Sequence, residues 1–383
     1  MPETTELSNP ESEYTRIGPG MNGLNGTVAR VATLSLLLYS FLVSIGMLGK
    51  AFKMFSGGFV GDLIESASDP LLGLLVGILV TSLVQSSSTT TSLVVALVGS
   101  GTMPIATAIP VVMGANIGTS VTNTLVSLSH IGRGQEFRRA FAASTIHDFF
   151  NIFAVMILLP LQVTTNFLGR SASALANAFS DVGGLTFASP LKLFTEPAVR
   201  TAASLFEGHP WLLLAAALAV MFASLRYLVV VLKILVLGRI ESFFDQTLFK
   251  NPGRAMLFGL AVTVLVQSSS ITTSLAVPLA GAGILTLRQV FPYTLGTNVG
   301  TTITAMLAAL AVGEISAVTV AFAHFLFNIT GILLVWPIPA IRRIPLRLAR
   351  RFSTIAADHR WLAIAYILVF FYALPFAAIL VMR

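Results

Sequence analysis

The sequence contains no cysteine, and only 10% of its 383 residues are charged. The absence of cysteine excludes disulfide bonds and thiolate metal sites, and it leaves the redox compartment of the protein undetermined. No glycine-rich loop leads into Lys-Ser or Lys-Thr and no His-Glu-x-x-His sequence occurs, so neither a nucleotide site nor a zinc-protease site is expected. A serine nucleophile would need an activating base nearby, and the serine-rich segments contain none. We therefore expect no enzymatic activity and no bound cofactor.

Hydrophobic residues dominate the chain. They make up 55% of it, with a mean hydropathy of +0.86, which indicates a multi-pass protein of the lipid bilayer. The net charge of +7 does not indicate a nucleic-acid partner, because the basic residues lie between apolar segments, as the positive-inside rule describes. Stretches near the bilayer-spanning length of about 20 residues occur at 31–50, 104–128, 141–161, 210–232, 291–311, 316–340 and 361–382.

Two further apolar segments, 70–100 and 252–283, differ from these seven because each carries the polar string Gln-Ser-Ser-Ser at its centre. The second string follows the first by 182 positions, and so does the second of two Gly-x-Asn-x-Gly-Thr motifs. Over residues 81–122 and 263–304, 21 of 42 positions are identical. We interpret the chain as two repeats and predict that each polar string is the tip of a re-entrant helical hairpin.

Each repeat is predicted to contain one crossing, a hairpin and two further crossings. An odd number of crossings places the second repeat in the opposite orientation. Lys and Arg concentrate in the loops that would be cytoplasmic with the amino terminus inside, which supports this inversion. Glycines around the motif asparagines suit unwound backbone, which is tolerated at membrane depth inside protein. The predicted fold is an all-α polytopic membrane protein with two inverted-topology repeats, each with a re-entrant helical hairpin and a broken transmembrane helix.

The predicted boundaries follow from this pattern. They are a disordered cytoplasmic amino-terminal tail at 1–30, the first repeat at 31–161, an extracytoplasmic linker at 162–209, the second repeat at 210–340, and a basic cytoplasmic segment with a final transmembrane helix at 341–383. The last apolar stretch lies outside the repeats, and the sequence predicts no functional role for it.

Hydroxyl and carboxamide groups dominate the repeated motifs, and these groups both donate and accept hydrogen bonds. One cluster can thus offer oxygens to a hard cation and N–H or O–H groups to an oxyanion, while the amino termini of broken helices favour an anion. A single copy would be interpreted more simply as helix packing, because serine, threonine and Gly-x-x-x-Gly also mediate contacts between membrane helices. Two copies at one offset favour a transport site at the interface between the repeats.

One acidic residue, Asp148, lies in a predicted crossing, where an ionisable group is costly and by default indicates function. Ion coordination is the hypothesis for Asp148, and an interfacial structural role is the alternative. Its counterpart in the second repeat is Phe325. The neighbouring His147 matches His324, and for these histidines a polar hinge bonded to backbone competes with a role as ligand.

The doubled Gln-Ser-Ser-Ser strings, Gly-Ala-Asn-Ile-Gly-Thr-Ser, and Glu-Phe-Arg-Arg-Ala-Phe leading into His-Asp-Phe-Phe-Asn closely resemble the type II sodium–phosphate cotransporters, over residues 60–340 approximately. The resemblance implies hairpin tips that meet near the membrane centre and bind inorganic phosphate beside sodium ions. The implied phosphate ligands are Gln85, Ser86, Ser87, Ser88, Gln267, Ser268, Ser269 and Ser270. The implied sodium ligands are Gln267, Ser268, Thr301 and Thr304 in the second repeat and Asn116, Asp148 and Asn151 in the first, together with the repeat-related Thr119 and Asn298.

Family members with an acid at the Asp148 position are electrogenic, so the resemblance implies electrogenic import of divalent phosphate by alternating access. Ser144 departs from the alanine that electrogenic relatives commonly have. The linker at 162–209 lacks the cysteines and glycosylation sequons of the animal proteins, so the chain is similar to a bacterial version in the plasma (inner) membrane, and a homodimer is compatible with it. The alternatives are a sodium-coupled carrier of another oxyanion or of a small carboxylate, a non-transporting phosphate sensor, and a channel.

Overall fold

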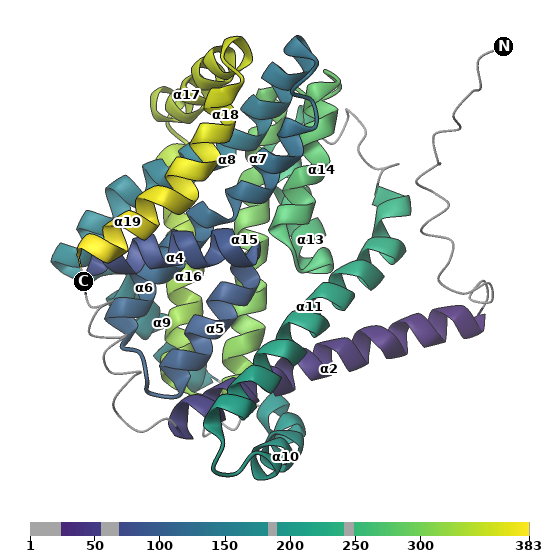
Figure 1. Cartoon of the computed structure of the whole chain (residues 1–383), viewed down its shortest axis with the longest axis vertical. Helices are drawn as coiled ribbons and strands as arrows, with labels where there is room; N and C mark the ends of the chain where they lie inside the picture. Colours follow the sequence, from purple (N-terminus) through teal and green to yellow (C-terminus); the bar gives the residue numbers. More distant parts are fainter. Residues whose placement is uncertain (1–23, 55–68, 183–189, 241–248, 383) are drawn as a thin grey trace.

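The computed structural model describes residues 24–54, 69–182, 190–240 and 249–382, and every regular element in these ranges is helical (Figure 1). The first half of the chain contains α2 (Leu24–Met54), α4 (Pro70–Val84), α5 (Ser87–Gly99), α6 (Ile105–Gly118), α7 (Ser120–Leu128) and α8 (Gly134–Thr165). The second half contains α11 (Pro210–Ile240), α13 (Pro252–Val266), α14 (Ser269–Gly281), α15 (Leu287–Val312) and α16 (Ile315–Val335). Between the halves lie α9 (Phe167–Val182) and α10 (Pro190–Leu205), and the chain ends with α17 (Pro339–Asp358), α18 (Trp361–Tyr366), a π-helix (Ile367–Ala373) and α19 (Leu374–Val381).

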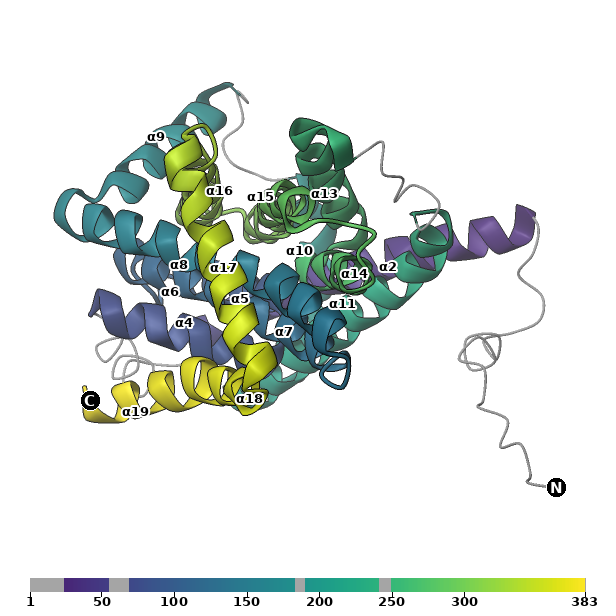
Figure 2. The same ribbon diagram turned by 90° about the horizontal axis from the view of Figure 1, so that it is seen from above.

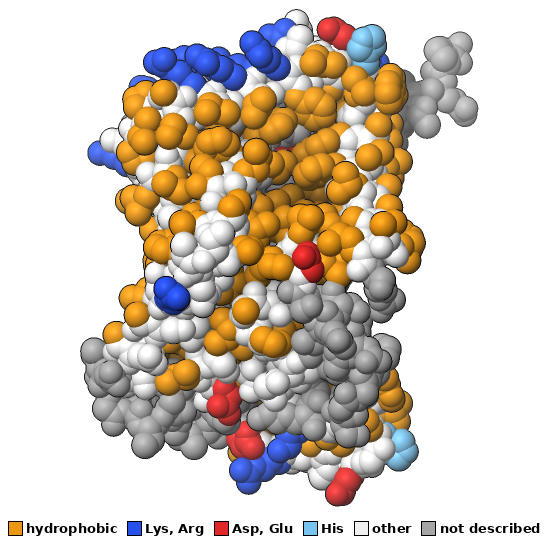
Figure 3. All heavy atoms as spheres, turned by 90° about the vertical axis from the view of Figure 1, so that its left-hand side faces the viewer, with side chains coloured by type: hydrophobic (Ala, Val, Ile, Leu, Met, Phe, Trp, Pro, Cys, Tyr) orange, Lys and Arg blue, Asp and Glu red, His pale blue; other side chains and the backbone are white. Residues whose placement is uncertain are grey.

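Six helical segments of the described ranges are long and apolar enough to cross a membrane. They are Val31–Ala51, Ile105–Leu128, Gly134–Thr165, Leu287–Val312, Ile315–Val335 and Trp361–Val381. The seventh predicted crossing, 210–232, falls in α11, whose described apolar part, Pro210–Leu225, is shorter than the others. Figure 3 shows the matching surface: a wide apolar belt separates an end rich in Lys and Arg from an end with mixed charge. The protein is therefore an all-helical, multi-pass membrane protein.

The paired helices α4–α5 and α13–α14 are built alike. Asp69 caps α4 by accepting hydrogen bonds from two first-turn N–H groups, and Asn251, 182 positions later, caps α13 in the same way. A proline follows each cap at the first helical position, where its missing N–H costs nothing. Two residues after each pair ends, a glycine has positive φ, Gly101 at 79° and Gly283 at 83°. The sequence repeat is thus repeated in local structure.

The glycines of the repeated motifs lie where α4 packs on α6 and α13 packs on α15. A Cβ on Gly114 would lie 2.0 Å from the carbonyl oxygen of Leu74, and one on Gly296 would lie 1.8 Å from that of Met256. The helix α15 runs unbroken through Gly296, and the α6–α7 junction at Thr119 keeps helical dihedral angles. The prediction of unwound backbone at these motifs is wrong, and so is a broken helix in the second half. The glycines serve close helix packing.

Two predicted boundaries also change. Residues 24–30 belong to α2, so only residues 1–23 of the predicted tail remain, and these lie outside the described residues. The predicted linker contains α9, which packs on α16. Leu168 and Ala172 are completely buried, and the ring of Phe179 lies 6.0 Å from that of Phe322.

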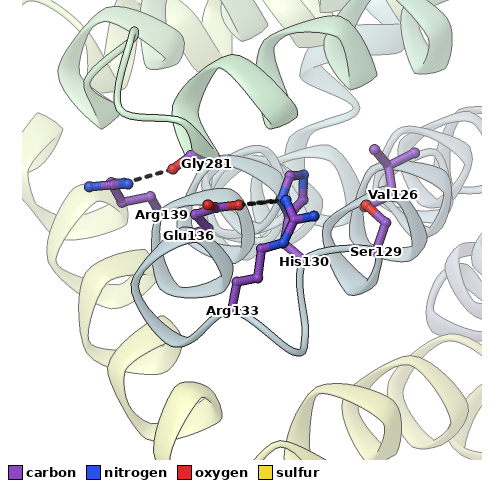
Figure 4. Close-up of polar contacts among 7 residues, drawn as sticks. All are labelled: Val126, Ser129, His130, Arg133, Glu136, Arg139 and Gly281. Atoms are coloured by element: carbon purple, nitrogen blue, oxygen red, sulfur yellow. Dashed lines mark hydrogen bonds and ion pairs between the residues drawn. The ribbon is translucent and has the colours of Figure 1, made fainter. Parts of the chain in front are cut away.

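The two halves meet at the Lys- and Arg-rich end through the start of α8 (Figure 4). Arg139 donates a hydrogen bond of 2.8 Å from Nε to the carbonyl oxygen of Gly281, the last residue of α14. A cation is favoured at this position because the carboxyl terminus of a helix carries partial negative charge. Nearby, Glu136 accepts a hydrogen bond of 3.1 Å from Arg133 and lies 3.3 Å from His130. The amphipathic helix α17 lies across the same end of the bundle, as Figure 2 shows from above.

Candidate functional site

Both Gln-Ser-Ser-Ser strings form the break between two helices. Gln85 ends α4 with φ 59° and ψ 24°, and Gln267 ends α13 with φ 54° and ψ 25°. The left-handed region costs a residue with a side chain about 1–2 kcal/mol. The glutamine side chain offsets this cost, because its Nε2 donates to a carbonyl of its own helix, that of Ser82 or of Val264, at 2.5 Å in both copies. The tight turn is therefore held by the glutamine amide itself.

The oxygen of each glutamine amide accepts a hydrogen bond from a later helix, α7 for Gln85 and α15 for Gln267. Thr122 donates a hydrogen bond of 2.8 Å to Oε1 of Gln85, and Thr304 donates one of 2.8 Å to Oε1 of Gln267. The structure thus brings together two residues of the predicted second-half sodium site. Thr301 lies one turn before Thr304, and its hydroxyl donates to the carbonyl of Thr297 at 3.0 Å. Each of these oxygens retains lone pairs for a hard cation.

The predicted phosphate-binding serines begin α5 and α14. Ser86 and Ser268 are the capping residues, and their hydroxyls accept hydrogen bonds from the third helical N–H. The next two serines of each string are buried, with exposed fractions between 3% and 6%. Among the described residues, no protein group forms a hydrogen bond with the side chains of Ser87, Ser88, Ser269 and Ser270. Together with the first-turn N–H groups, which have no partner within a helix, these hydroxyls form two donor-rich ends suited to an anion.

A buried hydrogen-bond network joins the two halves. The imidazole of His147 forms a hydrogen bond through Nε2 with Oδ1 of Asn298. Asn298 in turn donates from Nδ2 to Oδ1 of Asn151 at 2.8 Å, and Asn151 donates to the backbone carbonyl of Asn116 at 3.0 Å. Since Oδ1 of Asn298 can only accept, the Nε2 of His147 must carry the proton. Its Nδ1 then accepts from the hydroxyl of Ser120, 3.0 Å away.

The histidine of the second half makes the corresponding contact with an asparagine of the first half. His324 places Nε2 3.4 Å from Oδ1 of Asn116, the counterpart of Asn298. Each histidine therefore pairs with the motif asparagine of the other half. Of the two alternatives for the histidines, a hinge bonded to backbone does not match these side-chain contacts, and a role as ligand stays a prediction. The two histidines join Asn116, Asn151 and Asn298 at the interface.

Asp148 is fully buried and directly follows His147 in α8. Ser120, whose hydroxyl contacts Nδ1 of His147, also lies beside this carboxylate. Its Oδ2 accepts a hydrogen bond of 2.9 Å from the hydroxyl of Tyr366, whereas its Oδ1 has no hydrogen-bond partner. No Lys or Arg of the described residues forms an ion pair with it. A buried carboxylate in this setting favours a bound cation.

The final helical segment supplies site contacts that the sequence did not predict. Besides Tyr366 on Asp148, Tyr372 donates a hydrogen bond of 2.9 Å to the carbonyl of Ser82 and lies 3.3 Å from Nε2 of Gln85. These hydroxyls are separated from their partners by 218 to 290 positions. The one available sequence signal is the pair of tyrosines in an apolar stretch, since a buried tyrosine hydroxyl usually finds a partner.

The protein is a helical bundle with an apolar belt, and its two repeated halves share a polar core. These features define a multi-pass membrane transport protein. The family model for the Na+/Pi-cotransporter matches residues 40–188 and 214–335, and the chain belongs to this family.

Curated relatives agree with the assignment. The chain is 35% identical to sodium-dependent phosphate transport protein 2A of Mus musculus, over 98% of this chain and 71% of that protein. It is 36% identical to protein 2A of Ovis aries, over 91% of this chain and 67% of the relative. It is 34% identical to protein 2B of Homo sapiens, over 91% of this chain and 64% of the relative. No solved structure matches the chain.

Proposed function

We propose that the protein is a sodium-coupled symporter that imports inorganic phosphate across the plasma (inner) membrane, with phosphate bound by the two serine-rich helix ends. The observation that supports this most directly is the repeated pair of largely buried serines at the starts of α5 and α14, whose hydroxyls bond to no described protein group and are free to bind a ligand. A tetrahedral oxyanion would supply the missing acceptors for both hydroxyls and first-turn N–H groups.

Coupling to sodium follows from the charge of the site. Phosphate is costly to remove from water, and Arg is its usual protein partner, yet neither string contains a basic residue. Sodium ions beside the anion would supply the positive charge. Phosphate and sodium then each bind more tightly in the presence of the other, because such a coupling free energy is reciprocal.

The proposal includes two sodium sites that differ in their ligands. In the second half, the oxygens of Gln267, Ser268, Thr301 and Thr304 form the proposed site. In the first half, Asp148 adds a fixed negative charge to Asn116, Thr119 and Asn151, and it binds the additional cation that makes transport of divalent phosphate electrogenic. The supporting observation is the unpartnered Oδ1 of Asp148, which has no counterpart at Phe325.

The proposed mechanism uses two inverted repeats, with α4–α5 and α13–α14 as re-entrant hairpins and the amino terminus in the cytoplasm. The reciprocal contacts His147–Asn298 and His324–Asn116 support a twofold relationship between the halves. The Lys- and Arg-rich end of the molecule fits the cytoplasmic side. Alternating access then moves the hairpins against helices that begin each repeat.

The test is phosphate uptake into proteoliposomes under an inward sodium gradient. We expect concentrative uptake that disappears when potassium replaces sodium, and equal uptake in both salts would refute the proposal. Gln267→Ala and Ser268→Ala should weaken sodium activation and phosphate affinity together. Ser129→Ala is the matched control, because its exposed hydroxyl bonds only to the carbonyl of Val126.

The donor groups of the serine-rich ends also suit other tetrahedral oxyanions, because hydroxyl and N–H groups do not distinguish phosphorus from arsenic or sulfur by charge alone. A competition series with arsenate, sulfate and small dicarboxylates during phosphate uptake separates these substrates. Sodium-dependent binding of phosphate without concentrative uptake would instead identify a sensor.

A further inference from the structure

A cavity of about 490 Å³ lies at the Lys- and Arg-rich end of the bundle, beneath α17. Five arginines from two helices line it. They are Arg288 in the first turn of α15 and Arg342, Arg343, Arg347 and Arg350 on α17.

The positive charge of this cavity is not balanced by neighbouring acids. Within the described ranges, no ion pair or side-chain hydrogen bond to an Asp or Glu involves any of the five guanidinium groups. Arg342 lies over the ring of Trp336, 4.6 Å from its centre, and this cation–π contact leaves its charge in place. The guanidinium groups around this cavity carry like charge and repel one another. A bound anion would therefore stabilise the group of five arginines.

The amino termini of two helices add to the positive electrostatic potential of the cavity. Pro252, the first residue of α13, and Arg288, in the first turn of α15, both line the cavity. The amino terminus of a helix carries a partial positive charge of about half an elementary charge. The charged side chains and both helix termini therefore favour an anion at one place.

The inner wall of the cavity is apolar and aromatic. The rings of Phe291 and Trp336 meet edge to face with centres 5.8 Å apart, and Leu346 is buried beside them. Tryptophan with nearby arginine is the usual composition of a membrane interface. A ligand that matches both parts of the wall carries an anionic group and an apolar portion.

We propose that this cavity binds the phosphate headgroup of an acidic phospholipid. Guanidinium groups bind phosphate oxygens through paired hydrogen bonds, and basic pockets between membrane helices at the cytoplasmic face suit such headgroups. The glycerol and upper acyl chains lie against the partly exposed ring of Trp336. Inorganic phosphate shares the anionic chemistry but leaves this ring uncovered.

The test uses full-length protein in detergent, in potassium buffer without sodium or phosphate, titrated with phosphatidylglycerol and followed by native mass spectrometry. The test variant is Arg343→Gln/Arg347→Gln, in which both replaced residues are exposed and line the cavity. The control is Arg138→Gln/Arg351→Gln, which removes the same charge from exposed positions outside it. We expect the Kd for phosphatidylglycerol to rise about tenfold in the test variant and less than about twofold in the control.

Equal weakening in both variants, or equal binding of phosphatidylcholine by the unchanged protein, overturns the proposal. Isothermal titration with inorganic phosphate in the same buffer separates the two sources of a phosphate group. Binding of inorganic phosphate that depends on Arg343 and Arg347, without binding of phosphatidylglycerol, overturns the assignment to a lipid. Neither readout requires transport, so the result is independent of the proposed symport.

Discussion

The hydroxyl of Tyr366 donates a hydrogen bond of 2.9 Å to the buried carboxylate of Asp148, 218 positions earlier in the chain. The ring of Tyr366 is held by Phe352 and Phe371, with ring centres 5.0 and 5.4 Å away. The π-helix that begins at Ile367 follows directly, and such segments are frequent at functional sites. The last membrane helix thus contacts the proposed first-half sodium site.

Tyr366→Phe should weaken sodium activation. The substitution keeps the ring packing and removes one hydrogen bond to a charged group, a contribution of about 1.5–3 kcal/mol. We expect the sodium concentration for half-maximal uptake to rise about tenfold, with the phosphate KM at saturating sodium changed little. Tyr227→Phe, at an exposed site, is the control. An unchanged sodium dependence would show that the hydroxyl only supports the fold.

Asp148→Asn should reduce the charge moved for each phosphate while phosphate uptake still requires sodium. The reason is that the variant loses the fixed charge proposed to bind the additional cation. Current and radiolabelled uptake are measured together in proteoliposomes. Asp69→Asn is the matched control, because the equivalent cap in the second half is already Asn251. Unaltered charge movement in Asp148→Asn would remove Asp148 from the coupling site.

Asn298→Ala should destabilise the protein by about 3 kcal/mol, because it leaves a donor of His147 and an acceptor of Asn151 buried without partners. Thermal unfolding in detergent measures the effect. Asn123→Leu provides the comparison, since both polar side-chain atoms of Asn123 are buried without a hydrogen-bond partner. It should unfold at the same or a higher temperature. If both variants unfold alike, the network contributes little to stability.

Gly114→Ala should prevent normal packing of α6 on α4. The new Cβ would lie 2.0 Å from a backbone oxygen of Leu74, and overpacking of this kind costs about 3 kcal/mol. We expect reduced yield and a lower unfolding temperature. Gly132→Ala, where a Cβ meets nothing within 4 Å, should behave as the unmodified protein. Comparable yields for both variants would contradict the close approach.

The sequence was sufficient for the helical fold and for the internal duplication, because both depend on local patterns and on a constant offset. It could not decide what the motif glycines do, since Gly114 is restricted by a carbonyl of another helix and not by its own backbone. Nor could it place Tyr366 and Tyr372, whose partners lie more than 200 positions away. The sodium and phosphate ligands themselves remain predictions, although Gln267 with Thr304, and Asn116 with Asn151 and Asn298, lie together in the structure.

His147 contacts Asn298, and His324 contacts Asn116, which is the exchange of partners that a twofold axis imposes on two identical subunits. A polypeptide of half this length would carry one histidine and one asparagine, and it could complete both contacts only by pairing with its own copy. Because both halves lie in one chain, they need not be identical. One half carries an acid at Asp148 and the other carries Phe325, a difference that two copies of one shorter chain could not have.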